Sequence, residues 1–267
     1  MLVYPSGVDV SSSALRFLSA KLRRLRRELG TRWRHLGPGR QALLALAHLR
    51  NGHPHAQLAA GFGIGTTTAY RYITEAVELL AALAPTLAEA ARTASTKALV
   101  LLDGTLLPID RITADRPFCS GRHKKHGMNV QVLADPSGRL LWASPALPGA
   151  VHDVRAAREH GIIAALTDAG ITCWADKEYR GAGGTVRVPY WGRWENLSTG
   201  QKAVNRSQAK IRALVEQAVA ILKSWRLLRK LRCSTTRITS LVQAIPTLHL
   251  ASSGDDGKGS VAVSAHD

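Results

Sequence analysis

Apolar residues recur every three or four positions near the start of the chain, as they do on one face of an α-helix. Leucine stands at positions 15, 18, 22, 25 and 29, and Gly30 follows, so an amphipathic helix with a basic outer face is predicted over 14–29. A second apolar helix is expected over about 40–50, ending near Asn51 and Gly52. Residues 85–96 are expected to form a helical connector. Residues 1–96 therefore predict an all-α domain.

Two helices separated by a sharp break are predicted between these segments. The first covers about 55–60, glycines interrupt the pattern at 61–63, and the second begins after Gly65 with Thr66 as its N-cap. Small residues at the break would let the helices cross closely, as a helix-turn-helix requires, although plain helical bundles share this geometry. Recognition helices contact base edges near their N-terminal end. The residues expected there are Thr66, Thr67, Thr68, Tyr70 and Arg71.

From Lys97 onward the pattern changes to short apolar runs separated by turn residues. We expect a buried strand ending at Asp103, two strands within 128–146 around the turn 135–138, and a strand that breaks at Asp176. A short strand over 185–191, a helix over about 153–169 and a long helix over about 201–230 complete the pattern. A mixed α/β sheet domain is therefore predicted over 97–251. The Gly/Ser-rich residues 252–267 are expected to be disordered.

The charge is strongly positive and unevenly distributed. Lys and Arg number 36 against 19 Asp and Glu, a net charge of +17. The segments 16–50 and 202–237 each hold ten basic residues and one acid, and the remainder is nearly neutral. Such segments are either solvated helix faces or surfaces that follow a phosphate backbone. The second interpretation makes nucleic acid the expected partner.

Composition excludes several other classes of protein. With 45% hydrophobic residues over 267 positions, the chain can bury a core. No apolar run reaches the ~18–20 residues that span a bilayer, and the N-terminus lacks the pattern of a secretory signal. Three distant cysteines suit a reducing cytosol, so we expect a cytoplasmic protein without a membrane partner. No phosphate-binding GxxxxGK[ST] loop is present, so ATP is not implied.

Three acids are candidates for chemistry. Asp103 and Asp176 are expected at strand ends, where ligands gather in open α/β sheets. Glu216 is the lone acid of the second basic segment. A helix over this segment would place Asn205, Arg212 and Lys223 on the same face as Glu216. Glu216 could form an ion pair with Arg212 or bind a metal, and the spacing leaves both open. Together the three acids suit two divalent cations, Mg²⁺ or Mn²⁺.

Four stretches in sequence order carry a family resemblance: LLDGTLLPIDR at 101–111, PGAVHD at 148–153, WADKEY at 174–179, and NRSQAKIRALVEQAVAILKSW at 205–225. In these stretches, and over about residues 1–250, the chain resembles the DDE-superfamily transposases of bacterial insertion sequences with an N-terminal helix-turn-helix. The resemblance implies an RNase H-like catalytic fold and metal-dependent cutting and joining of double-stranded DNA at terminal inverted repeats. It also implies a nucleoid-associated protein that could form a homo-oligomer on DNA.

The resemblance assigns roles to individual residues. Asp103, Asp176 and Glu216 match the three catalytic, metal-binding acids of the family. Asp153 also matches a family position, either as a fourth ligand or as a group that supports the ligands, and it is the alternative second acid. Arg212 and Lys223 match the family's cations, which are expected on the phosphates of the terminal repeats. The tyrosine that related transposases carry three residues before Arg212 is absent, because position 209 is Ala. Asn205 is the matching polar residue instead, and it is expected to contact the DNA.

Two side-chain clusters allow more than one interpretation. The spacing of Cys119, His123 and His126 could hold zinc. The basic residues between them, Arg122, Lys124 and Lys125, favour instead a basic loop that contacts DNA. Trp191 and Trp194 lie beside Arg187 and Arg193. They could stack on an unpaired base or anchor a loop in the core.

One departure from the family favours a rival function. Glu178 stands where the family usually has Gly; it would be strained at a positive φ, and it adds a negative charge near Asp176. The chain could therefore be a catalytically impaired transposase relic, or a helix-turn-helix DNA-binding regulator without catalysis. A nuclease of the same fold that cleaves without joining is a third hypothesis.

Overall fold

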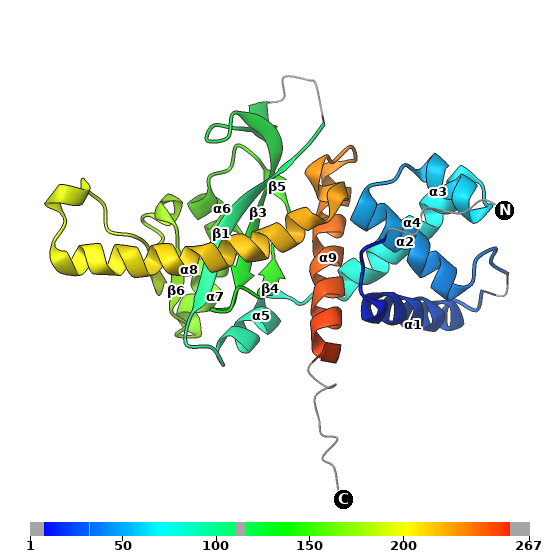
Figure 1. The fold of residues 1–267 in the computed structure, drawn as a ribbon, viewed down its shortest axis with the longest axis horizontal. Helices are drawn as coiled ribbons and strands as arrows, with labels where there is room; N and C mark the ends of the chain where they lie inside the picture. The colour runs from blue at the N-terminus through cyan, green and yellow to red at the C-terminus, as the bar shows by residue number, and fades with distance from the viewer. Residues whose placement is uncertain (1–7, 32, 111–115, 257–267) are drawn as a thin grey trace, which may run out of the picture. The chain divides into compact units, whose positions relative to one another are not determined.

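The computed structural model describes residues 8–31, 33–110 and 116–256. Its contacts divide the chain into two compact units, Met1–Ala84 with Ala244–Asp267, and Pro85–Gln243. Each unit is described by itself, and Figure 1 labels the elements. Among the described residues, no helix is both long and apolar enough to cross a membrane.

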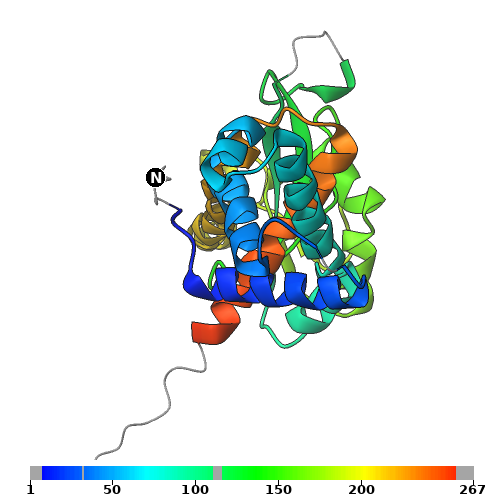
Figure 2. The same ribbon diagram turned by 90° about the vertical axis from the view of Figure 1, so that its right-hand side faces the viewer.

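The first unit is built from the predicted helices. They are α1 (Ser12–Glu28), α2 (Pro38–Asn51), α3 (His55–Phe62) and α4 (Thr66–Ala82). Ser11 caps α1 by accepting the Ala14 N–H at 3.2 Å, and α2 ends at Gly52 in the left-handed conformation, with φ of 70°. Figure 2 shows α1 running crosswise to α2. The leucine periodicity is thus confirmed as a helix that buries one face.

The break between α3 and α4 depends on Gly63. This residue has φ of 67°, in the left-handed region that favours glycine. Gly65, not the expected Thr66, is the N-cap of α4, because Gly65 is still extended while Thr66 is the first helical residue. The two helices bury Leu58 and Ile73 completely. The predicted pair of helices is therefore present, with its cap one residue earlier.

The second unit contains the mixed sheet that the sequence predicts. Its strands are β1 (Val100–Pro108), β2 (Cys119–Ser120), β3 (Lys125–Ala134), β4 (Leu140–Ala143), β5 (Leu147–Pro148), β6 (Cys173–Ala175) and β7 (Val186–Arg187). The order is β2-β3-β1-β6-β7, and β4 and β5 also pair with β3. β1 is antiparallel to β3 but parallel to β6, and β6 is parallel to β7. The mixed α/β prediction is confirmed.

Helices pack against this sheet. They are α5 (Leu87–Ala94), α6 (Asp153–Glu159), α7 (Ile162–Asp168) and α8 (Thr199–Ser224). Buried residues of α5, α6 and α7 form one core cluster with Val100 and Leu102 of β1. In Figure 1, α8 crosses the sheet in front of β1 and β3, and its N-terminal part continues beyond the sheet edge. α5 therefore packs in the sheet unit, although the sequence analysis places it in the helical domain.

Two predicted helices and the predicted tail differ from the structure. The helix expected over 153–169 is two helices, because Gly161 adopts φ of 70° between α6 and α7. The long final helix ends at Ser224, where Trp225 turns to an extended conformation before a short 3₁₀ helix, Arg226–Arg229. A further helix, α9, spans Thr235–Asp256. It includes 252–256, which the sequence analysis assigns to a disordered tail, since extending an existing helix costs far less than starting one. Residues 257–267 of that tail lie outside the described residues.

Candidate active site

Asp103 lies inside β1 and not at its end as expected. The strand continues to Pro108 because β3 pairs with it along 101–108. The parallel neighbour β6 is shorter, and its last residue, Ala175, pairs with Leu102. Asp103 is therefore the first residue of β1 beyond the stretch that pairs with β6.

Asp176 directly follows β6 and so lies beside Asp103. Its side chain is almost fully buried, and Oδ1 accepts the Glu178 N–H at 2.7 Å, which caps a short 3₁₀ helix, Lys177–Tyr179. Asp103 and Asp176 line one small cavity together with Gln208 and Val215 of α8. The structure thus brings the first two predicted acids together beneath α8.

A larger cavity on the same side joins Asp103 to the third predicted acid. It has a volume of about 400 Å³, and Asp103, Glu216 and Lys223 border it with His123 and Lys125. Glu216 is exposed, whereas Lys223 is half-buried, and this burial lowers the pKa of the Lys223 ammonium while Asp103 partly offsets the effect. α8 therefore supplies both an acid and a cation opposite β1.

Asp153 approaches β1 from the opposite face. Side chains alternate between the faces of a strand, so Gly104 faces away from the side to which Asp103 points. A Cβ at Gly104 would lie only 2.2 Å from Asp153 Oδ1, which means that only glycine admits the carboxylate there. Asp153 is thus adjacent to Asp103 in space but separated from it by the strand.

A buried hydrogen-bond network holds Asp153. Its Oδ1 accepts from Asn129 Nδ2 at 2.7 Å and from Gln131 Nε2 at 3.3 Å. Tyr179 Oη donates to Gln131 Oε1 at 2.5 Å. Burial raises the pKa of Asp153, and nearby Asp176 contributes. The pKa of Tyr179 is also raised, first by burial and then by the charges of Asp153, Asp103 and Asp176.

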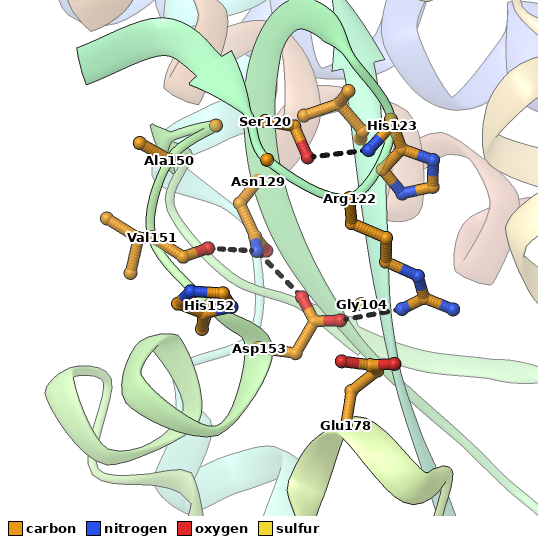
Figure 3. A pocket seen from close by; sticks show the side chains of 13 residues that line it. Gly104, Ser120, Arg122, His123, Asn129, Ala150, Val151, His152, Asp153 and Glu178 are labelled. Atoms are coloured by element: carbon orange, nitrogen blue, oxygen red, sulfur yellow. Dashed lines mark hydrogen bonds and ion pairs between the residues drawn. The ribbon is translucent and has the colours of Figure 1, made fainter. Parts of the chain in front are cut away.

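Arg122 connects two of the acids from the turn between β2 and β3. Its guanidinium lies 3.4 Å from Asp153 Oδ2 and 3.5 Å from Asp176 Oδ2. Figure 3 shows Arg122 reaching Asp153 across the pocket, which Glu178 also lines. A cation between buried carboxylates offsets their mutual repulsion.

The sequence predicts no site role for the residues of this network. Arg122 is expected only as part of a basic loop, and no role is predicted for Asn129, Gln131 or Tyr179. The sequence does carry one signal, because Asn129 and Gln131 are alternate polar residues in the otherwise apolar run 128–134. Alternation places both on one face, and buried amides in such a position need partners.

Glu178 does not carry the strain that a positive φ would impose. It lies in the 3₁₀ helix after Asp176, and Lys124 is the one non-glycine residue with positive φ in the described part of the chain. The added negative charge is present, however, because Glu178 lines the same pocket as Asp153 and Arg122.

The donor chemistry of the site fits a hard divalent cation, because Asp103, Asp176 and Glu216 offer carboxylate oxygens around adjoining cavities. In the arrangement present, no three His, Cys, Asp or Glu side chains within the described segments are close enough to hold one ion. This applies equally to the zinc interpretation of Cys119, His123 and His126.

The remaining predicted DNA contacts are distributed over both units. Lys124 and Lys125 are exposed at the turn into β3. Asn205 bonds the backbone of Tyr190 through both its amide atoms, and the side chain of Arg212 lies outside what the structure describes. On α4 all five predicted residues occupy the first two turns. Thr66, Thr67, Tyr70 and Arg71 are exposed there, and Thr68 is partly buried.

Comparisons with known proteins agree with this architecture. Residues 102–249 match the family model described as DDE superfamily endonuclease, and residues 34–86 match the helix-turn-helix of DDE superfamily endonuclease. The putative transposase for insertion sequence element IS112 of Streptomyces albus G is 31% identical over 222 residues, which is 78% of each chain. No solved structure matches the chain. The chain belongs to the DDE-superfamily transposases that carry an N-terminal helix-turn-helix.

Proposed function

We propose that this transposase cleaves and joins DNA strands at terminal inverted repeats, with Asp103, Asp176 and Glu216 as its catalytic acids. The observation that carries the proposal is their convergence: β1 and the end of β6 place two of them side by side, and α8 places the third across a shared cavity. Asp176 is preferred to Asp153 as the second acid because Asp153 lies on the other face of β1.

The acids would hold two ions, Mg²⁺ or Mn²⁺. Such ions, when bound, activate water or a 3′-hydroxyl and stabilise both oxygens of an in-line phosphoryl displacement. Lys223 borders the same cavity as Asp103 and Glu216, where its ammonium can bind a phosphate of the cleaved strand. Asp153 acts indirectly, by holding Arg122 against Asp176.

Duplex recognition is assigned to the first unit. The exposed N-terminal residues of α4 would read base edges of the repeat in the major groove, as the second helix of a helix-turn-helix does. Joining of two ends to target DNA would be carried out by a homo-oligomer assembled on the DNA. The proposed reaction takes place on the chromosome, which is where the expected nucleoid association would place the protein.

Glu216→Gln tests the catalytic assignment. The substitution keeps the shape of the side chain but removes the charge that a cation needs, so metal-dependent cleavage of a labelled duplex bearing the terminal repeat should fall by at least about 100-fold. End binding, measured by anisotropy, should change by less than about twofold. Glu159→Gln is the matched control, because Glu159 is an exposed acid at the end of α6, outside the site. Full cleavage by Glu216→Gln would overturn the proposal.

Glu178 favours a second candidate function, that of a DNA-binding regulator or impaired relic. It lines the same pocket as Arg122 and Asp153, and its carboxylate would compete with the catalytic acids for the divalent cations. The wild-type protein decides between the candidates in the same assay. Repeat binding without any metal-dependent cutting supports the regulator, cutting without joining supports a nuclease, and joined products support transposition.

A further inference from the structure

Three large aromatic side chains are exposed on one loop of the sheet unit. Tyr190 is 51% exposed, Trp191 74% and Trp194 45%. Exposure of this extent excludes the interpretation in which Trp191 and Trp194 anchor the loop in the core. We name Tyr190, Trp191 and Trp194 the aromatic platform; large exposed apolar groups gathered at one place are typical of a binding surface.

Cations already lie over the indole rings. The Arg180 guanidinium is 3.9 Å from the centroid of the Trp191 ring, and Arg206 and Lys202 lie 5.3 Å and 5.9 Å from that of Trp194. Residues 180–206 hold five basic residues against one acid, Glu195. The surface therefore combines flat aromatic groups with positive charge.

The chain holds the platform in place. Asn205 of α8 accepts the Tyr190 N–H at 2.8 Å and donates to the Tyr190 carbonyl at 3.1 Å. Buried Leu197 fixes the other end of the loop, and Ser198 then caps α8 in a capping box with Gln201. Both amide atoms of Asn205 are thus engaged with the loop, so its structural role is to position the platform.

We propose that the aromatic platform binds unpaired nucleotides of a DNA strand. Every base has a flat face that can stack on Trp or Tyr, and neighbouring cations neutralise the phosphates, so this combination binds single strands with little sequence preference. The 74% exposure of Trp191 leaves the face opposite Arg180 open, so that a base stacked there would complete a guanidinium–indole–base stack.

Charge and position favour DNA over a protein partner. An apolar protein surface would cover the rings but would bury the cations beside them without compensation. Arg180 also lies four residues beyond Asp176, and the platform precedes the helix that carries Glu216. The identity of the strand rests on the proposed function: it would be the strand separated from the duplex near the cleavage position.

The test measures binding of the full-length protein to a fluorescent oligodeoxythymidine and to a duplex of equal length, in EDTA so that no cleavage occurs. The double substitution Trp191→Ala with Trp194→Ala should weaken binding of the single strand about tenfold or more, because it removes the two indole rings on which bases would stack. Binding of the duplex should change by less than about twofold, since the Lys and Arg side chains that would contact its phosphates remain. Trp33→Ala is the matched control, because Trp33 is 94% exposed but lies in the other unit.

Asn205→Ala provides a second variant, in which all three aromatic side chains are retained. It removes both hydrogen bonds to Tyr190, so single-strand binding should weaken while circular dichroism and duplex binding stay unchanged. Unchanged single-strand binding in the double variant, or an equal loss in Trp33→Ala, would overturn the proposal. So would a change in self-association without a change in strand binding. Loss of cleavage in Glu216→Gln with normal strand binding separates this proposal from that for the active site.

Discussion

Gly104 determines where the Asp153 carboxylate can lie. The missing side chain lets Asp153 approach β1, where a Cβ would meet Oδ1 at 2.2 Å and the carboxyl carbon at 2.4 Å. Asp153 in turn is tied to Asn129 and Arg122 by hydrogen bonds. The glycine of the Asp-Gly-Thr motif is therefore required by close approach and not by a positive φ.

Gly104→Ala should consequently destabilise the protein. Because Asp153 is held on several sides, the new methyl group can be accommodated only by breaking those bonds or moving the strand, and we expect a loss of about 2 kcal/mol in the free energy of unfolding. Urea denaturation of the metal-free protein measures it. Gly121→Ala is the control, since nothing lies within 4 Å of a Cβ at Gly121. Equal stability of the two variants would show that the close contact is absent.

The candidate acids of the proposed site could be named from the sequence, whereas the residues that hold them could not. Asp103 and Asp176 are predicted because each ends an apolar run, and Glu216 because it is the lone acid of a basic segment. These are local features of the sequence. Arg122 reaches Asp153 and Asp176 from a distant turn, and only the folded sheet shows this. The separation of Asp103 from Asp153 by a strand is likewise a consequence of packing.

At the scale of elements, periodicity predicted type better than extent. The helices of the first unit and the strands on both sides of the turn 135–138 are where the pattern places them. β1 is longer than expected because its antiparallel partner β3 supplies hydrogen bonds beyond Asp103, which no local pattern reveals. The helix over 153–169 divides at Gly161, where a positive φ ends α-helical geometry.

Buried polar contacts also join the helices of the first unit. Arg34 makes two hydrogen bonds to Glu75 of α4, at 3.0 and 2.9 Å, and buried Gln41 of α2 donates to Glu75 at 2.8 Å. The Arg34 and Glu75 side chains are only 23% and 18% exposed. This network orients α4, the helix proposed to read DNA.

Glu75→Gln should therefore lower the free energy of unfolding by about 1–3 kcal/mol, because it leaves Arg34 without a charged partner in a mostly buried place. Chemical denaturation followed by circular dichroism measures the change. The Arg24–Glu28 pair provides the comparison, since its side chains are 70% and 56% exposed. Glu28→Gln should cost much less, because solvent screens an exposed ion pair. A cost for Glu75→Gln as small as that for Glu28→Gln would contradict the network's role.

At the scale of the whole molecule, the positive charge has two different uses. Within the first basic segment, Arg26 donates to the Leu36 carbonyl and to Gln41, and Arg34 pairs with Glu75, so both act within the fold. Arg23 and Arg27 of α1 are exposed. The charge pattern of the sequence does not distinguish these four arginines, because it does not show which of them form hydrogen bonds to distant segments.

Of these four arginines, only the exposed Arg23 and Arg27 should contribute to the salt dependence of duplex binding. Removing one phosphate contact lowers the slope of log K against log salt by about 0.9, so Arg23→Ala with Arg27→Ala should reduce it by about 1.8 if both side chains bind the DNA backbone. Titrations of the repeat duplex at several salt concentrations measure the slope. Arg92→Ala is the control, because Arg92 is exposed on α5 outside both basic segments. An unchanged slope in the double variant would assign the exposed face of α1 to solvent, and the electrostatic interaction with DNA would then have to come from other basic residues.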